Sequence, residues 1–450
     1  MFRPIGTLDF RNGESEKRFR SIMMQRILLC LVLLVLLAAC QPVALREEVA
    51  PAVSTTVSGA YYSDTYPNLF VDLLDKSPAE VDAKIDAAWQ QLFYGNDARE
   101  RVYYPVGEEM AYVMDINNND IRSEGISYGM MLAVQLDKQD EFDRLWRWAK
   151  TQMQHQSGPH RGYFAWHVRE DGTMLDQNAA SDGEEWIVTA LFLAAARWGN
   201  GDGILNYEAE ANAILQAMLH REENPDHNAR VTPMFDPEEK LVVFVPTGGA
   251  NTFTDPSYQT PHYYELWARW AAEDNAFWCD AAQASRAFLQ RTVHPETGLA
   301  PDYANFDGTP RELNSGDGHA DFRFDAWRVA KNVALDHLWF APSDWHVEQS
   351  NRWLDFFYNE GIRTYGNQYT LAGEKLSSDH SLGLVAMNAV AALAADHPAK
   401  AEFVQHLWNA SPPTGRYRYY DGLLYLLGLT QVSGHFRIYH LTPTTAAPCE

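Results

Sequence analysis

Apolar residues recur at three- and four-residue spacing along most of the chain after residue 77, a pattern typical of amphipathic helices. The first such segment begins with Ser77-Pro78-Ala79-Glu80, which has the form of a capping box with proline in the first helical position. Four apolar side chains then share one face, and Gly95 follows as an end signal: Val81, Ile85, Trp89 and Leu92. This pattern predicts a helix from about 78 to 94.

Eleven further stretches have the same helical pattern, which makes twelve helices in all. They lie near 124–137, 140–155, 183–198, 207–221, 257–273, 275–292, 325–338, 344–361, 381–395, 399–409 and 417–430. Only 162–168 and 240–246 read as short strands, and no strand–helix alternation supports a parallel sheet. We therefore expect an all-α fold, an (α/α)6 barrel of six helical hairpins with long catalytic loops at one end.

The N-terminal region reads as a targeting segment rather than as part of the fold. Met23-Met24-Gln25-Arg26 leads into the apolar run 27–37, which is shaped like a signal peptide and too short to span a bilayer comfortably. Residues 37–40, Leu-Ala-Ala-Cys, look like a bacterial lipobox, so residues 1–40 are predicted to be a signal peptide with lipidation at Cys40. An ordinary secretory signal and an uncleaved anchor are the alternatives, and residues 1–22 could reflect a misassigned start codon.

After this segment the predicted domain organisation is simple. A tether of Ser, Thr, Val and Ala covers residues 41–67, the catalytic domain covers 68–440, and a tail covers 441–450. Cys279 and Cys449 are too few for a disulfide framework and lack metal-site spacing, so stability is expected to come from the core.

Composition narrows the partners that this chain can bind. The 450 residues carry 36 basic and 60 acidic side chains, a formal charge of -24, which would repel nucleic acid. Hydrophobic residues make up 46% of the chain and aromatic residues 13%, enough for one large core or two medium ones. Aromatic rings usually fill cores, but they also form flat platforms under sugars. A neutral polymer is therefore a better partner, and protein partners stay unknown.

Three acidic segments could carry chemistry. In the first, a polar loop turns into an apolar helix at Glu124, which places a carboxyl at a helix N-terminus. The second contains Asp182 and Glu185, and the third places Asp325 and Arg328 three residues apart, where they can meet on one helical face. Each also has a plain structural interpretation, as a helix-dipole partner, a capping box or an intrahelical ion pair. The carboxylates alone leave the function open.

The residues around these positions resemble glycoside hydrolase family 8. The resemblance rests on segments 122–130 (Arg-Ser-Glu-Gly-Ile-Ser-Tyr-Gly-Met), 181–185 (Ser-Asp-Gly-Glu-Glu) and 324–328 (Phe-Asp-Ala-Trp-Arg), in the family's order, and runs from about Tyr61 to Tyr439. It implies an (α/α)6 barrel and an inverting glycoside hydrolase that uses neither a cofactor nor a metal in the chemistry.

The resemblance also implies roles for individual residues. Glu124 matches the general acid and Asp325 the base that activates water. Asp182 matches the carboxylate that grips the distorted sugar. Tyr258, in Thr-Asp-Pro-Ser-Tyr, matches the tyrosine that helps to hold the water, and Arg328 would orient the base.

Two further positions bear on substrate binding. Trp166 is a candidate stacking platform, with a core position as the alternative. Phe324 stands directly before the base, where the family's endoglucanases have Tyr.

Within the family, the chain is similar to the reducing-end xylose-releasing exo-oligoxylanases. Matches at 162–166, 255–258, 261–266, 297–301 and 303–310 carry this likeness. It implies a β-1,4-xylo-oligosaccharide substrate and places the histidine that limits the cleft at His380, although a surface histidine is the alternative. An endo-acting xylanase, cellulase, lichenase or chitosanase, and a non-catalytic oligosaccharide-binding lipoprotein, are the other interpretations. For inversion, the carboxyls of Glu124 and Asp325 should be ~6.5–9.5 Å apart.

Overall fold

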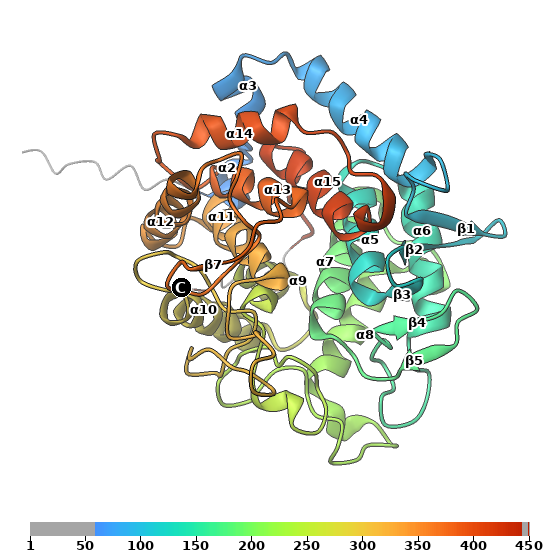
Figure 1. The fold of residues 1–450 in the computed structure, drawn as a ribbon. Helices are drawn as coiled ribbons and strands as arrows, with labels where there is room; N and C mark the ends of the chain where they lie inside the picture. Colours follow the sequence, from blue (N-terminus) through green and yellow to red (C-terminus); the bar gives the residue numbers. More distant parts are fainter. Residues whose placement is uncertain (1–58, 443–448, 450) are drawn as a thin grey trace, which may run out of the picture. The chain divides into compact units, whose positions relative to one another are not determined.

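The computed structural model describes residues 59–442 and Cys449. The predicted signal peptide, Cys40 and most of the predicted tether lie outside the described residues, as do 443–448 of the predicted tail. The described chain forms one compact unit that contains helices α2–α15 and two small sheets (Figure 1).

Six helices line the inside of this unit and are buried along nearly their whole length. They are α5 (Ser123–Gln135), α7 (Ser181–Trp198), α9 (Pro261–Trp270), α11 (Arg328–Phe340), α13 (Leu382–Ala391) and α15 (Tyr420–Val432). Each packs on the next in this order, and α15 packs back on α5, so the ring closes. The closed ring confirms the predicted barrel.

Six outer helices bury only one face each, as amphipathic helices do. They are α4 (Pro78–Tyr94), α6 (Gln139–Trp148), α8 (Tyr207–Leu219), α10 (Asn275–Thr292), α12 (Trp345–Glu360) and α14 (Lys400–Asn409). Each packs on the inner helix beside it in the sequence, and α4 packs on α15. All twelve predicted helices are present, although α9 and α11 begin three to four residues later than expected, after the short 3₁₀ turns η5 (Pro256–Tyr258) and η6 (Phe324–Trp327).

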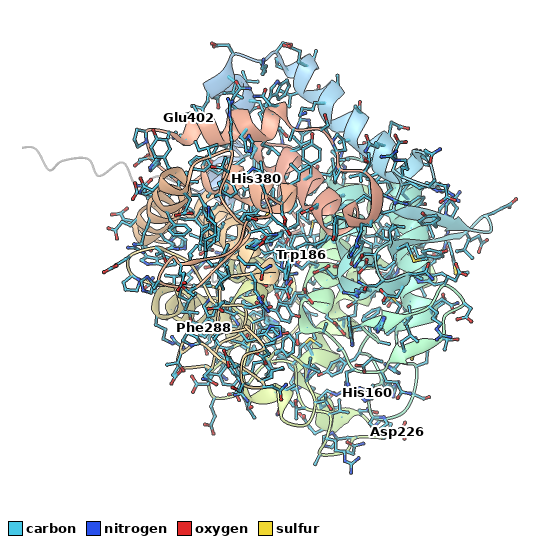
Figure 2. All side chains as sticks on the ribbon, viewed as in Figure 1. His160, Trp186, Asp226, Phe288, His380 and Glu402 are labelled. Carbon is cyan, nitrogen blue, oxygen red and sulfur yellow. A yellow bond between two sulfur atoms is a disulfide. The ribbon has the colours of Figure 1, made fainter. Side chains whose placement is uncertain are left out.

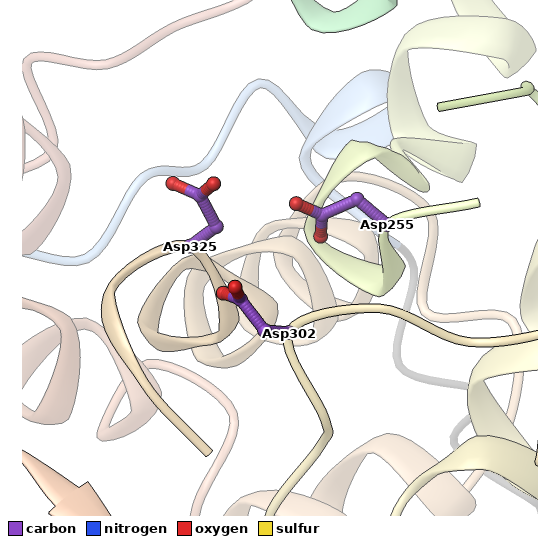
Figure 3. A group of neighbouring side chains, drawn as sticks. All are labelled: Asp255, Asp302 and Asp325. Atoms are coloured by element: carbon purple, nitrogen blue, oxygen red, sulfur yellow. The ribbon is translucent and has the colours of Figure 1, made fainter. Parts of the chain in front are cut away.

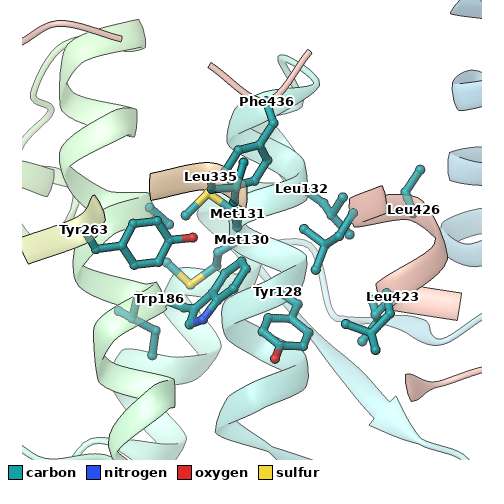
Figure 4. Packing of buried hydrophobic residues seen from close by; sticks show 14 of the residues in the cluster. Tyr128, Met130, Met131, Leu132, Trp186, Tyr263, Leu335, Leu423, Leu426 and Phe436 are labelled. Atoms are coloured by element: carbon teal, nitrogen blue, oxygen red, sulfur yellow. The ribbon is translucent and has the colours of Figure 1, made fainter. Parts of the chain in front are cut away.

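The barrel interior is filled by side chains of the inner helices. In Figure 4, residues 128–132 of α5 pack between Trp186 of α7, Tyr263 of α9 and Leu423 of α15. The rings of Tyr128 and Trp186 meet edge to face with centroids 4.6 Å apart. This packed interior fixes the positions of the helix N-termini that carry the predicted site residues.

The strand predictions were largely wrong. Of the segment 162–168, only β4 (His167–Val168) is a strand, and 240–246 makes a single isolated bridge at Val242. An antiparallel five-stranded sheet joins β4 to four strands that the sequence pattern did not indicate: β1 (Tyr103–Val106), β2 (Met110–Asp115), β3 (Asp120–Arg122) and β5 (Met174–Asp176). A second pair, β6 (Gln368–Tyr369) and β7 (Lys375–Ser377), follows α12. Burial on both faces of β2 removes the alternation that identifies half-buried strands.

The folded unit extends beyond both predicted boundaries. Helix α2 (Ala60–Ser63) lies within the predicted tether, yet Ala60 is buried and the helix packs on α11, before α3 (Leu69–Leu74) begins. In the predicted tail, Cys449 forms a disulfide with Cys279 of α10. Stability therefore does not come from the core alone, because this bond closes a loop of 170 residues.

Among the described residues, no helix combines the length and the apolar character that crossing a membrane requires.

Candidate active site

The catalytic candidates lie where the N-termini of the inner helices meet. Glu124 is in the first turn of α5 and Asp182 in the first turn of α7. Gly183 allows these two turns to approach, since a Cβ there would lie 2.6 Å from the Ser123 hydroxyl. Gly125 likewise leaves room for the Tyr419 ring, which a Cβ would meet at 2.5 Å. The glycines beside both carboxylates are thus required by packing.

Arg328 joins the three predicted carboxylates into one cluster. Its Nη1 lies 3.0 Å from Glu124 and 2.9 Å from Asp182, while Nη2 lies 3.0 Å from Asp325. The guanidinium also donates to the Tyr128 hydroxyl at 2.6 Å and to the Ser257 hydroxyl at 2.8 Å. The predicted Asp325–Arg328 pair is therefore present, but the arginine orients all three carboxylates rather than the base alone.

Glu124 has the surroundings of a proton donor. Burial and the nearby negative charges of Asp325 and Asp182 outweigh the attraction of Arg328 and raise the pKa of Glu124 to about 8. Its second carboxyl oxygen is 3.2 Å from the Tyr419 hydroxyl, and 19% of the side chain stays exposed. Glu124 can therefore hold its proton at neutral pH and still reach a ligand.

Asp182 and Asp325 differ in exposure. The Asp182 carboxyl is only 6% exposed, and burial raises its pKa to about 6 although Arg328 opposes the shift. The capping interpretation of Asp182 is wrong, because α7 already begins at Ser181 and no side chain caps it. Asp325 lies in η6 with 31% of its side chain exposed, so it is the carboxylate with most access to water.

Tyr258 lies beside the guanidinium that joins the carboxylates. Its ring is 5.7 Å from the Arg328 guanidinium and stacks on Phe244. Burial raises the pKa of its hydroxyl well above the usual value, so the group stays protonated and can donate a hydrogen bond. The role of Tyr258 at the attacking water stays a prediction.

Trp166 lies beside the acid. Its carbonyl accepts a hydrogen bond from the Ser123 amide at 3.0 Å, directly before Glu124, and the Arg122 guanidinium lies 5.5 Å from its ring. The side chain is half-buried rather than enclosed in the core. The position suits a platform for a sugar bound on the acid side.

His380 is not part of the carboxylate cluster. It lies in the exposed loop between β7 and α13, and in the view of Figure 2 its label falls between Glu402 of α14 and Trp186 of α7. Its Nδ1 is 2.9 Å from the Tyr365 carbonyl and its Nε2 is 2.9 Å from Nε2 of His406. A carbonyl only accepts, so the network assigns the proton of neutral His380 to Nδ1, and Nε2 then accepts from His406.

Several site residues were not predicted from the sequence: Tyr128, Ser257, Tyr419, Asp255 and Asp302. All of them lie within or next to the quoted motifs except Tyr419, which precedes α15; Asp302, in the loop after α10, falls between the quoted segments 297–301 and 303–310. The signal that could have found Tyr419 is the aromatic pair at the start of an otherwise aliphatic helix.

Asp255, Asp302 and Asp325 converge, with one carboxyl oxygen from each within 4.8 Å of the others (Figure 3). The spacing alone would suit a cation. However, Arg328 and the imidazole of His319 already face this group, His319 Nδ1 being 2.5 Å from Asp302. We therefore assign no metal to it.

A proton donor and a partly exposed carboxylate held by one arginine, at the loop end of a closed (α/α)6 barrel, are typical of a glycoside hydrolase. The chain matches glycosyl hydrolases family 8 over residues 112–434 and belongs to that family.

The chain is similar to several characterised members of this family. It is 46% identical to the reducing-end xylose-releasing exo-oligoxylanase Rex8A of Paenibacillus barcinonensis, over 86% of this chain and 100% of that protein. A structure of a Rex8A variant with an arabinofuranosyl-xylotetraose superimposes with a TM-score of 0.81 at 45% identity, covering 87% of this chain and 100% of the other. A family 8 xylanase of Teredinibacter turnerae, in complex with xylohexaose, gives a TM-score of 0.80 at 44% identity, covering 85% and 100%.

Proposed function

We propose that this enzyme hydrolyses β-1,4-xylo-oligosaccharides with inversion and releases xylose from the reducing end. The observation that carries the reaction type is the cluster around Arg328, in which a protonated Glu124 and a water-accessible Asp325 are bound to different nitrogens of one guanidinium.

The chemistry follows from these positions. Glu124 gives its proton to the glycosidic oxygen while the bond to the anomeric carbon breaks. Asp325 removes a proton from the water that attacks this carbon from the opposite face, so the product has the inverted configuration. Asp182 and the Tyr258 hydroxyl hold the distorted sugar and the water between the two. Arg328 keeps the three carboxylates at fixed spacing.

The substrate class rests on the relatives. An exo-oligoxylanase and a xylanase are both more than 40% identical to this chain over most of its length. Both act on xylose polymers or oligomers by their names. Their similar identity keeps an endo-acting xylanase as the second candidate, so the mode of attack has to be tested separately from the substrate.

His380 is the proposed determinant of the exo mode. We propose that the reducing-end anomeric hydroxyl donates to Nε2 of His380 in place of His406, while the Tyr365 carbonyl keeps Nδ1 protonated. Burial holds the pKa of His406 at about 4, so it stays neutral and exchanges without a charge change. A sugar without this hydroxyl cannot replace His406 at Nε2 and loses this hydrogen bond with the enzyme, so it should bind and react less well.

The decisive experiment compares xylotriose with xylotriose reduced to the alditol. We expect free xylose from the first, slow reaction of the second, and little action on polymeric xylan. Proton NMR of the fresh product should show the α-anomer at the new reducing end. Rapid loss of xylan viscosity, with mixed oligomers as early products, would identify an endo enzyme instead.

Two variants separate the proposed role of His380 from its packing. His380→Ala should lose the discrimination against the alditol along with much of the rate. His406→Ala removes the competing partner but keeps His380, so it should retain the discrimination. Equal discrimination in both variants and the wild type would refute the role of His380.

We also propose that the enzyme is an exported lipoprotein, anchored at Cys40. The Cys279–Cys449 disulfide supports export, since disulfides persist in oxidising compartments. Several acyl chains anchor firmly where one does not. The mature protein should fractionate with membranes, and Cys40→Ser should release it or leave the precursor uncut. Unchanged fractionation and processing of this variant would contradict lipidation.

A further inference from the structure

The proposed base, Asp325, belongs to a group of three aspartates. Figure 3 shows the carboxyls of Asp255, Asp302 and Asp325 turned toward a common space, although they come from the segment before η5, the loop after α10 and η6. Asp255 is 0% exposed and Asp302 3% exposed, whereas 31% of the Asp325 side chain is exposed. The carboxyls of Asp255 and Asp302 are therefore buried next to that of Asp325, which water can reach.

Hydrogen bonds leave one oxygen unpaired on each buried carboxyl. One oxygen of Asp255 accepts from the Ser257 amide at 2.7 Å, and one oxygen of Asp302 pairs with His319 Nδ1. The other oxygens, Oδ2 of Asp255 and Oδ1 of Asp302, are buried and have no hydrogen-bond partner among the described residues. A group made only of ionised carboxylates would offer acceptors here and no donor, which is costly in a buried position.

The cations around the group are too few for three negative charges. Arg328 is 3.0 Å from Asp325 but 4.0 Å from Asp255, and it also binds Glu124 and Asp182. His319 is bound to Asp302 and not to the others. The charged or titratable groups that face Asp255 are Asp302, Asp325, Arg328, Tyr258 and Tyr303. Asp255 thus has like charges nearby and no cation of its own.

We propose that Asp255 is a positioning residue that stays a neutral carboxylic acid, supplies the missing hydrogen-bond donor of this group from Oδ2, and thereby keeps the negative charge on Asp325. The proposal rests on Asp325 being the base of the proposed function. Burial raises the pKa of Asp255 well above the usual range, with the Asp325 charge as the next cause. For Asp302, the His319 contact opposes the effect of burial, and its pKa is about 6.

This assignment leaves one uncompensated negative charge in the group. The pair of Asp302 and His319 is neutral as a whole, Asp255 is neutral by itself, and Asp325 is the carboxylate that remains to take a proton from water. Were Asp255 ionised, its charge would hold the proton on Asp325 more tightly and reduce the fraction of active enzyme at acidic pH.

Matched amide variants test this assignment through the acidic limb of the kcat/KM profile on xylotriose. Asp255→Asn replaces a neutral acid by a neutral amide that can still donate a hydrogen bond. The pH at which kcat/KM falls on the acidic side should therefore stay unchanged. Asp302→Asn removes a carboxyl that is ionised above about pH 6 and leaves His319 without its partner, so the part of the limb above that pH should move down by about 1 pH unit. An equal downward shift in Asp255→Asn would show that Asp255 is ionised and overturn the proposal.

A direct measurement keeps the test independent of activity and of how well the variant folds. In protein labelled with ¹³C at the Asp carboxyls, one wild-type signal should keep the shift of a protonated acid from pH 5 to 8. It should persist in Asp302→Asn and disappear in Asp255→Asn. If every wild-type Asp carboxyl has ionised by pH 7, the proposal is wrong even where hydrolysis follows the proposed function. Calorimetric binding of Ca²⁺ or Mg²⁺ that Asp255→Asn abolishes would also refute it, since a ligand must be ionised.

Discussion

Glu124 and Asp325 bind the same guanidinium at the same distance, 3.0 Å, yet they are suited to opposite tasks. The side chain of Glu124 is 19% exposed and carries a pKa of about 8, while that of Asp325 is 31% exposed and lies at the edge of the cluster. Burial raises the pKa of Glu124 and so makes it suitable as the acid, whereas its access to water makes Asp325 suitable as the base.

The largest effects should come from removing either carboxyl. Glu124→Ala and Asp325→Ala should each lower kcat on xylotriose by roughly 10²–10⁴-fold, because each removes one proton-transfer group. Thermal unfolding should show that both variants keep the fold. A rate near that of the wild type in either variant would remove that residue from its role.

The leaving group separates the two roles. A nitrophenyl β-xylobioside has a phenolate leaving group that needs little protonation, so the rate of Glu124→Ala on this substrate should come close to the wild-type rate on it, even though both are slowed by the missing reducing-end hydroxyl. Asp325→Ala should stay slow, since water activation is still required. Equal recovery of both variants would break the distinction between acid and base.

Arg328 connects the two carboxyls, and its removal should affect both. Arg328→Met leaves buried negative charges without a partner, so we expect the free energy of unfolding to fall by about 3–5 kcal/mol at pH 7. Arg328→Lys keeps the charge, but an ammonium cannot reproduce the geometry of the guanidinium fork. It should therefore recover stability more than activity, as measured by denaturant unfolding and by kcat. Full activity in Arg328→Lys would show that charge alone suffices.

The pH dependence offers a finer comparison. The alkaline limb of kcat/KM should fall near pH 8, where Glu124 loses its proton. A carboxyl whose pKa is raised in the folded state binds its proton more tightly when folded. Its contribution to stability is therefore present below pH 4.5 and is lost as the pH rises toward about 8. Glu124→Gln does not titrate, so its stability relative to the wild type should increase from pH 5 to 9. A constant difference in the free energy of unfolding would mean that Glu124 is ionised throughout.

The sequence predicts the helices better than the contacts among the site residues. Helical periodicity identifies all twelve barrel helices, because each outer helix buries one face and most residues of each inner helix are apolar. It missed every strand except β4; among those missed, β2 is buried on both faces and the others are only two to four residues long. It also took Asp182 as a possible cap, since the spacing to Glu185 is the same whether the carboxyl binds a helix amide or Arg328.

The long-range contacts of the site could not be predicted from spacing. Glu124 and Arg328 are 204 residues apart and Glu124 and Tyr419 are 295 apart, so only the closed barrel brings them together. The glycines in two of the motifs are a partial signal of these contacts. Gly125 leaves room for the Tyr419 ring and Gly183 for the Ser123 hydroxyl, and both of these groups come from distant parts of the chain.

The smallest effect on activity should come from a change outside the cluster. The Cys279–Cys449 disulfide joins α10 to the C-terminal end and touches none of the catalytic residues. Cys279→Ser should lower the free energy of unfolding by roughly 2–4 kcal/mol, mainly because the unfolded chain gains conformational entropy. The rate of hydrolysis and both limbs of the pH profile should stay unchanged. Cys449→Ser should have the same effect, and the double variant should be no less stable than either single one, because all three lose the same bond. A shifted alkaline limb in these variants would show that the pKa of Glu124 depends on the outer helices and not on its immediate surroundings alone.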